Sequence, residues 1–157
     1  MPSKNFNLKD IQKKIEYYCS YQERSHKEVT DKLYKMGVKK NTIDEILAYL
    51  IQNDFLNEAR FASQYTYGKF RIKFWGKRRI KYGLKKHKIS EYNIKNALNN
   101  IKDEDYKRTL SNITMKVLDS CQKEKLKKKK EKVFMALKYR GWESELIYEQ
   151  IKKINTD

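Results

Sequence analysis

The chain has little of the residues that interrupt regular structure: one proline, Pro2, and five glycines among 157 residues. This scarcity leaves long segments free to form helices and argues against a large β-sheet with its many turns. Two cysteines, Cys19 and Cys121, are too few for a disulfide framework. Each follows an aliphatic residue by four positions, so we expect both to be reduced core residues on helices.

Long apolar runs are also missing. No stretch approaches the ~20 apolar residues that a membrane span requires, and the first residues contain no apolar signal segment. We therefore expect a cytoplasmic location and no membrane partner. We also expect a monomer. Acidic residues are scarce as well: 20 of them face 37 lysines and arginines, which leaves a formal net charge of +17.

What the chain does contain is one apolar spacing repeated three times, at intervals of about 50 residues. The repeats are anchored on Leu33, Leu84 and Leu137. Five other positions are apolar at the same distance from each anchor, and each set of equivalent positions is called a column. They are, in chain order, Val29, Ile80 and Val133 at −4; Val38, Ile89 and Trp142 at +5; Ile43, Ile94 and Ile147 at +10; Leu47, Leu98 and Ile151 at +14; and Leu50, Ile101 and Ile154 at +17. Each column is apolar in every copy, so the chain repeats a supersecondary unit.

Within a repeat, the columns at −4 and 0, and at +10, +14 and +17, have helical spacing and are separated by a predicted turn. Gly37 and Gly141 stand at +4, where a helix end tolerates a left-handed residue. Lys88 holds this place in the central copy, so its turn must either differ or carry strain of about 1 kcal/mol. Gly83, inside a predicted helix, should cost that helix about 1 kcal/mol relative to alanine.

Capping residues support these helices. Ser25 with Glu28 is typical of a capping box, and Thr42 with Glu45 predicts another. Ser90 is expected to cap the corresponding helix of the central copy.

A further apolar stripe precedes each helix pair, so each repeat is predicted to hold three helices. The three stripes are Ile11, Ile15 and Tyr18; Phe61, Tyr65 and Gly68; Leu110, Ile113 and Val117. The fold class is therefore all-α: an elongated tandem array of three three-helix repeats, about nine helices, at 8–53, 55–101 and 103–154. One such unit is too small to bury much surface alone, so either neighbours should pack together or the single units should be only marginally stable.

Charge is unevenly divided among the repeats. Residues 1–54 carry a net +2 and residues 102–157 a net +5, whereas residues 55–101 hold 12 basic and 2 acidic residues, a net +10. This asymmetry indicates a polyanionic partner, either nucleic acid or an acidic protein surface.

The strongest candidate site is residues 69–88, in which ten of twenty residues are Lys or Arg and none is acidic. If Ile80 and Leu84 point inward, Arg78, Tyr82 and Lys85 should face outward, with Arg79 and Lys86 on the flank. Guanidinium groups pair with phosphates and aromatic rings stack on bases. The alternative is a solvated helix face with Trp75 and Tyr82 half-buried. The predicted partner-binding residues are Lys69, Arg71, Lys73, Trp75, Lys77, Arg78, Arg79, Tyr82, Lys85 and Lys86.

A second basic run covers residues 123–132, with seven lysines and two glutamates. Positive charge in the first turn of a helix opposes the macrodipole, which mildly favours a functional reason for it. A solvated helix start explains it equally well. Its candidate residues are Lys127, Lys128, Lys129 and Lys130.

Catalytic constellations and ligand clusters are not evident in the sequence. His26 and His87 have no cysteine or carboxylate at zinc-ligand spacing, and we expect His87 to be a surface residue. No glycine-rich phosphate loop is present. We therefore expect no enzyme activity, no metal and no cofactor.

Several segments resemble the RecX regulatory proteins. Residues 21–28, Tyr-Gln-Glu-Arg-Ser-His-Lys-Glu, followed by Leu33 and Gly37-Val38, resemble the first repeat of that family. Residues 56–62, Leu-Asn-Glu-Ala-Arg-Phe-Ala, resemble its acidic, then Arg-Phe-Ala segment. Residues 76–84 are similar to its Gly-x-x-Arg-Ile-x-x-x-Leu run. The chain departs from the family at Asn57, where an acid is expected, and at Lys88, where glycine is favoured.

The resemblance implies a nine-helix array that binds the RecA recombinase and its filament on single-stranded DNA and limits recombinase activity. The matched positions are largely structural, so the basic stretch remains an inference from charge alone. The alternative is a free-standing helical protein that binds nucleic acid without sequence preference. Reversing Arg78, Arg79, Lys85 and Lys86 to glutamate is predicted to weaken filament binding without unfolding the protein.

Overall fold

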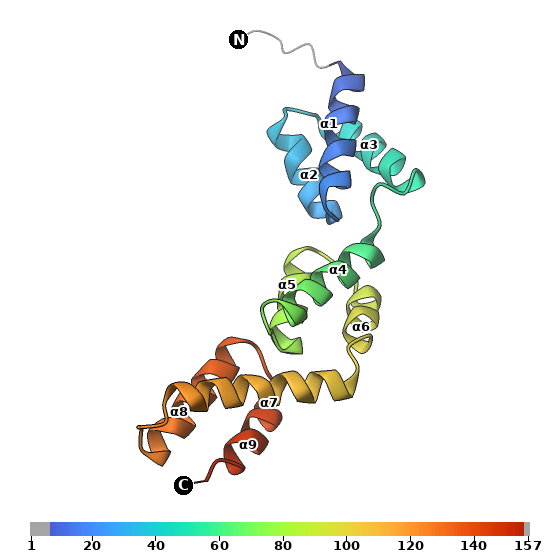
Figure 1. Ribbon diagram of the computed structural model, residues 1–157. Helices are drawn as coiled ribbons and strands as arrows, with labels where there is room; N and C mark the ends of the chain where they lie inside the picture. Colours follow the sequence, from blue (N-terminus) through green and yellow to red (C-terminus); the bar gives the residue numbers. More distant parts are fainter. Residues whose placement is uncertain (1–6, 156–157) are drawn as a thin grey trace.

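A computed structural model describes residues 7–155, which form nine helices and no strand within that range (Figure 1). This confirms the predicted all-α class. The helices are α1 (Leu8–Tyr21), α2 (His26–Lys35), α3 (Lys40–Gln52), α4 (Glu58–Arg71), α5 (Lys77–Lys86), α6 (Glu91–Asn99), α7 (Asp103–Ser120), α8 (Leu126–Tyr139) and α9 (Ser144–Lys152).

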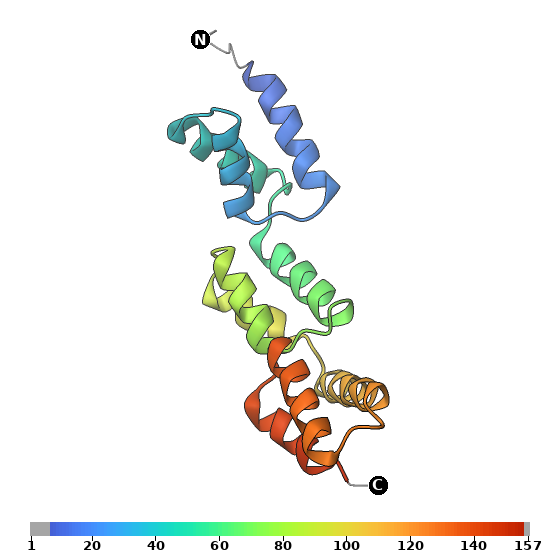
Figure 2. The same ribbon diagram turned by 90° about the vertical axis from the view of Figure 1, so that its left-hand side faces the viewer.

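The helices follow one another in groups of three, here called the first triplet (α1–α3), the central triplet (α4–α6) and the third triplet (α7–α9). Both views show the triplets stacked along one long axis, with α1 near one end and α9 near the other (Figures 1 and 2). The array is elongated, as predicted. The division of the chain into separate domains at 8–53, 55–101 and 103–154 stays a prediction.

The predicted apolar columns fill the interior. The anchor column and the column four residues before it are completely buried in every triplet. The columns at +5 and +10 are also buried throughout, whereas the +14 column is half-buried. Equivalent positions therefore occupy equivalent places in three successive units, which is what makes the spacing repeat.

The same turn joins the last two helices of each triplet. Gly37 and Gly141 adopt left-handed backbone, with φ of 83° and 84°, and Lys88 adopts it too, with φ of 62°. The lysine thus keeps the glycine turn and carries strain of about 1 kcal/mol. Gly83 has a different reason to be glycine: a Cβ there would collide with the Tyr65 hydroxyl.

Most of the predicted caps are present. Ser25 and Glu28 form the reciprocal capping box of α2, and the Ser90 hydroxyl accepts from the Asn93 amide to cap α6. Asn57 caps α4: its side-chain oxygen Oδ1 accepts a hydrogen bond from the Arg60 backbone amide. The asparagine side chain thus provides the capping acceptor that the expected acidic residue would provide. The prediction of a capping box at Thr42 and Glu45 was wrong, because α3 already begins at Lys40.

The buried side chains gather into two cores. One belongs to the first triplet alone and includes Ile15, Leu33 and Leu50. The other runs without interruption through the central and third triplets and includes Phe61, Ile80 and Trp142. Cys19 and Cys121 are buried free thiols, as predicted. Burial raises the pKa of the Cys19 thiol to about 11, so it stays protonated and unreactive near neutral pH.

Among the described helices, none is long and apolar enough to cross a membrane. Residues 7–155 likewise contain no group of three or more His, Cys, Asp or Glu side chains placed to hold a metal ion.

Candidate functional site

The candidate site is centred on α5, whose two faces differ completely. Ile80 and Leu84 are 0 % exposed and point into the core, as the spacing predicted. Arg78, Tyr82 and Lys85 lie on the opposite side in solvent, and Tyr82 is 60 % exposed. We call Arg78, Tyr82, Lys85 and Lys86 the cationic face of α5.

Carboxylates barely neutralise this face. The only acidic partner it finds within residues 7–155 is Glu91, whose carboxylate lies 3.8 Å from Lys85 Nζ. Both side chains are more than half exposed, so this pair contributes little in water. Lys86 Nζ instead lies 4.9 Å from the centre of the Tyr82 ring. The cationic face therefore presents a ring between positive groups.

The N-terminus of α5 is held by the third triplet. Gly76, the N-cap residue, has no side chain to accept from the first free N–H groups of the helix. The missing acceptors come from the α8–α9 turn and from α7. The amides of Gly76, Lys77 and Arg78 donate to Arg140 O at 2.8 Å, Tyr106 Oη at 2.8 Å and Gly141 O at 3.1 Å.

This docking requires small residues on both sides. A Cβ on Gly76 would lie 2.5 Å from Gly141 O, and one on Gly141 would collide with Arg79. Tyr106 completes the junction because its hydroxyl also donates to Glu143. Burial, followed by that bond, raises the pKa of Tyr106 and keeps the phenol protonated.

Arg79 and Trp75 belong to this junction more than to a free surface. Arg79 Nη1 donates to Tyr139 O at 3.0 Å, and its guanidinium lies 4.1 Å from the Trp75 ring centre and 4.7 Å from that of Tyr139. Both side chains are half-buried. Reversing Arg79 would therefore disturb the packing of the third triplet as well as remove a charge.

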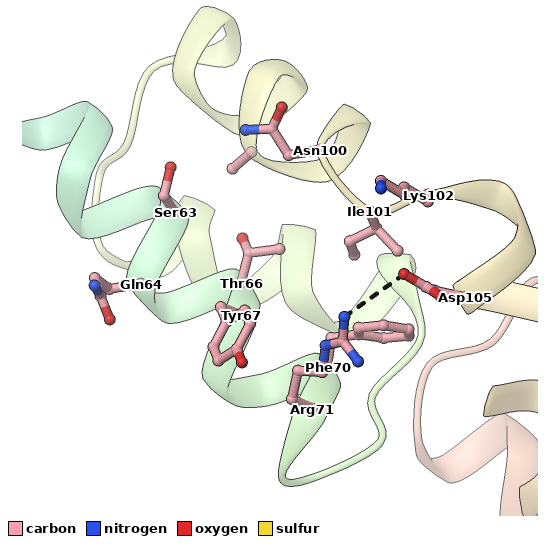
Figure 3. A pocket seen from close by; sticks show the side chains of 11 residues that line it. Ser63, Gln64, Thr66, Tyr67, Phe70, Arg71, Asn100, Ile101, Lys102 and Asp105 are labelled. Atoms are coloured by element: carbon pink, nitrogen blue, oxygen red, sulfur yellow. Dashed lines mark ion pairs between the residues drawn. The ribbon is translucent and has the colours of Figure 1, made fainter.

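Three further predicted residues have partners inside the molecule. Lys69 Nζ lies 4.8 Å from the Trp75 ring centre, and Lys77 Nζ lies 4.7 Å from that of Tyr106. Arg71 pairs with Asp105 at 3.5 Å beside a cavity of about 410 Å³ between α4, α6 and the start of α7 (Figure 3). Lys73 is exposed in the α4–α5 loop. The ten predicted residues thus divide into two groups. Within residues 7–155, the side chains of Lys73 and the cationic face are exposed and have ion-pair or cation–π contacts only within α5 or with the exposed Glu91, whereas Lys69, Arg71, Trp75, Lys77 and Arg79 contact neighbouring helices or loops.

The second basic run lies at the start of α8. Lys127 and Lys128 are exposed, Lys129 and Lys130 are half-buried, and no acidic residue stands in the first turn. Glu124 pairs with Lys132 at 3.1 Å rather than with these lysines. The positive first turn opposes the helix dipole, as the sequence indicated.

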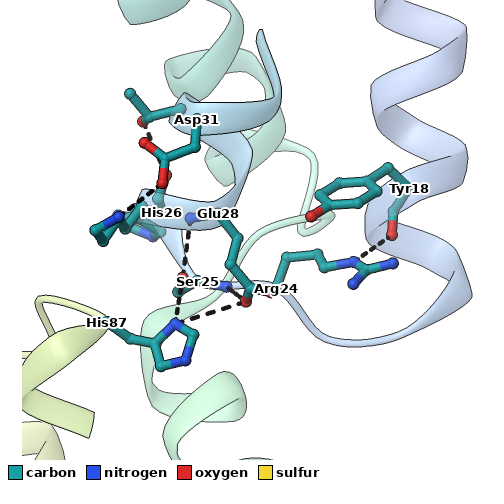
Figure 4. Close-up of polar contacts among 9 residues, drawn as sticks. Tyr18, Arg24, Ser25, His26, Glu28, Asp31 and His87 are labelled. Atoms are coloured by element: carbon teal, nitrogen blue, oxygen red, sulfur yellow. Dashed lines mark hydrogen bonds and ion pairs between the residues drawn. The ribbon is translucent and has the colours of Figure 1, made fainter. Parts of the chain in front are cut away.

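His87 is not the surface residue that was expected. Its Nδ1 lies 3.1 Å from Ser25 Oγ and 3.9 Å from a carboxylate oxygen of Glu28, so it joins α5 to α2 (Figure 4). Its ring also packs on Phe61 and Tyr65, with ring centres 5.0 and 5.5 Å apart. The sequence reasoning missed this role because Ser25 stands 62 positions earlier in the chain.

The sequence contains one sign that the N-terminus of α5 needs a partner: Gly76, the residue before the helix, has no capping side chain. A helix that starts after a residue without a capping side chain needs another acceptor for its first N–H groups. The sequence around Gly76 does not indicate that the α8–α9 turn provides these acceptors.

Two protein-family models match segments of this chain. The first three-helix domain of RecX matches residues 15–50, and the second three-helix domain of RecX matches residues 57–98. The chain belongs to the RecX family.

Curated RecX relatives agree with this assignment. The regulatory protein RecX of Clostridium perfringens (strain 13 / Type A) is 26 % identical over 136 residues, covering 85 % of this chain and 63 % of the relative. That of Listeria welshimeri is 28 % identical over 129 residues, covering 82 % of this chain and 48 % of the relative. The chain therefore spans less than two thirds of the length of these RecX proteins.

Solved RecX structures share the fold. The crystal structure of RecX from Lactobacillus salivarius has a TM-score of 0.81 at 25 % identity, covering 93 % of this chain and 95 % of that one. A second crystal structure, of a regulatory protein RecX, has a TM-score of 0.82 at 21 % identity, covering 94 % and 73 % of the two chains.

Proposed function

We propose that this chain is a regulatory protein that binds the RecA recombinase and its filament on single-stranded DNA, and inhibits the recombinase in recombination and DNA repair. Membership of the RecX family supports the regulatory role. The observation that carries the binding proposal is the cationic face of α5, exposed and almost free of carboxylates at the middle of an elongated array.

The shape and the charge support the same partner. A nucleoprotein filament is long and carries a phosphate backbone, and an extended array of repeats offers a long contact surface to it. Lysine and arginine groups on α5 would release counterions from phosphates on binding. We further propose that the protein works in the cytoplasm, where the buried thiols of Cys19 and Cys121 stay reduced.

The test is the ATPase activity of RecA on single-stranded DNA, measured with increasing amounts of this protein. The variant carries Arg78→Glu, Lys85→Glu and Lys86→Glu and leaves Arg79 in place, because Arg79 holds the third triplet. Wild-type protein should lower the ATPase rate, and the variant should need at least about tenfold more protein for the same effect. Each lost contact between a basic side chain and a phosphate lowers the affinity and makes the affinity less sensitive to salt concentration.

A matched control makes the same charge change at another triplet. Lys35, Lys39 and Lys40 are all exposed around the α2–α3 turn, and Lys35 stands two residues after its anchor, as Lys86 does. Reversing these three lysines to glutamate should leave inhibition within about twofold of wild type. Equal inhibition by wild type and the α5 variant, with both folded, would contradict the assignment of the site.

The exposed Tyr82 among cations favours a second candidate, a free-standing nucleic-acid-binding protein. In that case bare single-stranded DNA, without recombinase, should bind as tightly as the filament does. The slope of log affinity against log salt should then shrink by about 0.7 for each charge removed from α5. Tight binding to the filament with weak binding to bare DNA would instead favour the regulator.

A further inference from the structure

A second aromatic and basic surface lies on the first triplet, far along the array from α5. It is a groove of about 720 Å³ on α1 and the segment that follows it, closed on the other side by α2. Three tyrosines line it: Tyr17, Tyr18 and Tyr21. Tyr17 and Tyr21 are 71 % and 72 % exposed, and their ring centres lie 6.4 Å apart. Within residues 7–155, these two exposed rings have only each other as an aromatic partner.

Four cations line the same groove: Lys13, Lys14, Arg24 and Lys32. Arg24 is held in place, because its Nε donates to Tyr18 O at 2.9 Å and its guanidinium lies 3.8 Å from the Tyr18 ring centre (Figure 4). Lys32 Nζ lies 5.4 Å from the same ring centre. The three lysines are exposed.

Among the residues that the structure describes, no carboxylate lines the groove. Of the acidic residues nearest in sequence, Glu16 accepts from Tyr49 Oη at 3.1 Å, Glu23 pairs with Arg60, Glu28 is in the α2 capping box, and Asp31 pairs with Lys27 at 2.7 Å. Asp10 is exposed on α1 one turn before Lys13 and Lys14 and is not among the residues that line the groove. The small net charge of residues 1–54 thus conceals a locally cationic groove. Sequence reasoning missed it because it summed charge over the segment.

We propose that this groove binds the bases and phosphates of single-stranded nucleic acid, without need of a recombinase. Exposed aromatic rings give unstacked bases a surface to stack on, and cations that line the same channel pair with the backbone. An acidic peptide would satisfy the cations but would leave Tyr17 and Tyr21 without partners. The proposal rests on this groove alone and does not depend on the function proposed for α5.

The experiment measures binding of end-labelled oligothymidylate by fluorescence anisotropy. The variant carries Tyr17→Ala and Tyr21→Ala, and its control carries Tyr17→Phe and Tyr21→Phe, which keep the rings. Alanine should weaken binding at least about fivefold, in line with the loss of one stacked base, whereas phenylalanine should stay within about twofold. Tyr34→Ala removes a half-exposed ring of α2 outside the groove and should have no effect.

Two competitors separate stacking from charge alone. An abasic strand of equal length presents phosphates without bases, so the alanine variant should bind it as wild type does. Polyglutamate presents charge without rings and should compete poorly for the groove. An equal loss on abasic and thymidine strands, or competition by polyglutamate equal to that of oligothymidylate, would overturn the proposal.

Binding at α5 could mask the effect, so each measurement is repeated in the Arg78→Glu, Lys85→Glu, Lys86→Glu background. A local readout comes from fluorotyrosine incorporation, with the fluorine signals of Tyr17 and Tyr21 assigned by the single Phe variants. Oligothymidylate should shift both signals in either background. Unmoved signals under saturating oligothymidylate would refute the groove and leave the α5 proposal untouched.

Discussion

The two junctions between triplets are built differently. The first and central triplets meet through polar side chains: His87 with Ser25 and Glu28, and Arg60 with Glu23. The central and third triplets share one hydrophobic core, and backbone amides of one bond to backbone carbonyls of the other. Buried apolar surface and close backbone contact hold two units at one fixed angle, whereas side-chain bonds at a half-exposed surface yield more easily.

From this difference we expect the central and third triplets to move as one body, with the first triplet attached to it by polar contacts. The cationic face of α5 lies on this two-triplet body, and the tyrosine groove lies on the other part. Two cysteines report on the two parts separately, because Cys19 is buried in the first triplet and Cys121 in the third.

The largest expected effect comes from Trp142→Ala. Trp142 is 1 % exposed, stacks on Tyr106 with ring centres 4.4 Å apart, and donates from Nε1 to Phe74 O. Its loss should lower the free energy of unfolding of the shared core by about 3–5 kcal/mol. Pulsed thiol labelling in rising denaturant should show Cys121 exposed much earlier, with Cys19 unchanged. Parallel exposure of both thiols would mean that the two cores unfold together.

A smaller loss is expected from Gly76→Ala. The new Cβ would press on the Gly141 carbonyl, where backbone meets backbone, and should cost about 1–3 kcal/mol. Gly68→Ala is the matched control, because nothing lies within 4 Å of a Cβ there and alanine favours the interior of α4. That control should stabilise by up to about 1 kcal/mol in thermal unfolding. Two changes of the same sign would contradict the close approach at Gly76.

The smallest effect is expected from His87→Ala at the polar junction. It removes the contact with Ser25 and the packing on Phe61 and Tyr65, worth about 1–2 kcal/mol together. Because His87 lies at the edge of the shared core and is not one of its buried residues, helix content should hold while small-angle scattering shows a broader spread of end-to-end distances. Lys86→Ala, on the exposed side of α5, serves as control. A distance distribution identical to wild type would show that the other contacts suffice to hold the first triplet.

The local helices and their buried faces were predictable because a helix imposes its period on nearby residues. The columns of Leu33, Leu84 and Leu137 needed no knowledge of distant contacts. The Ser25 and Ser90 caps were equally local. The prediction that Thr42 caps a helix was wrong, because several neighbouring residues can start a helix and α3 starts at Lys40.

The candidate site was predicted only in part. Arg78, Tyr82 and Lys85 were correctly placed outside, since the helical period alone decides which side opposes Ile80 and Leu84. Arg79 could not be separated from them, because Tyr139, whose carbonyl accepts from Arg79 and whose ring packs on it, lies 60 residues further along the chain. Trp75 in turn packs on Arg79 and Tyr65. The tyrosine groove depends on Lys32 of α2 meeting α1, and no spacing within either helix encodes that.

By itself, the sequence determined the repeat, the helices, their buried faces and the excess of positive charge, because these depend on side-chain chemistry and on neighbours within about four positions. Only the tertiary structure decided which cations remain free, why Gly76 must be glycine, and that His87 joins two triplets. Those outcomes depend on atoms brought together from segments about 30 to 70 residues apart, and their meeting follows from how the helices pack.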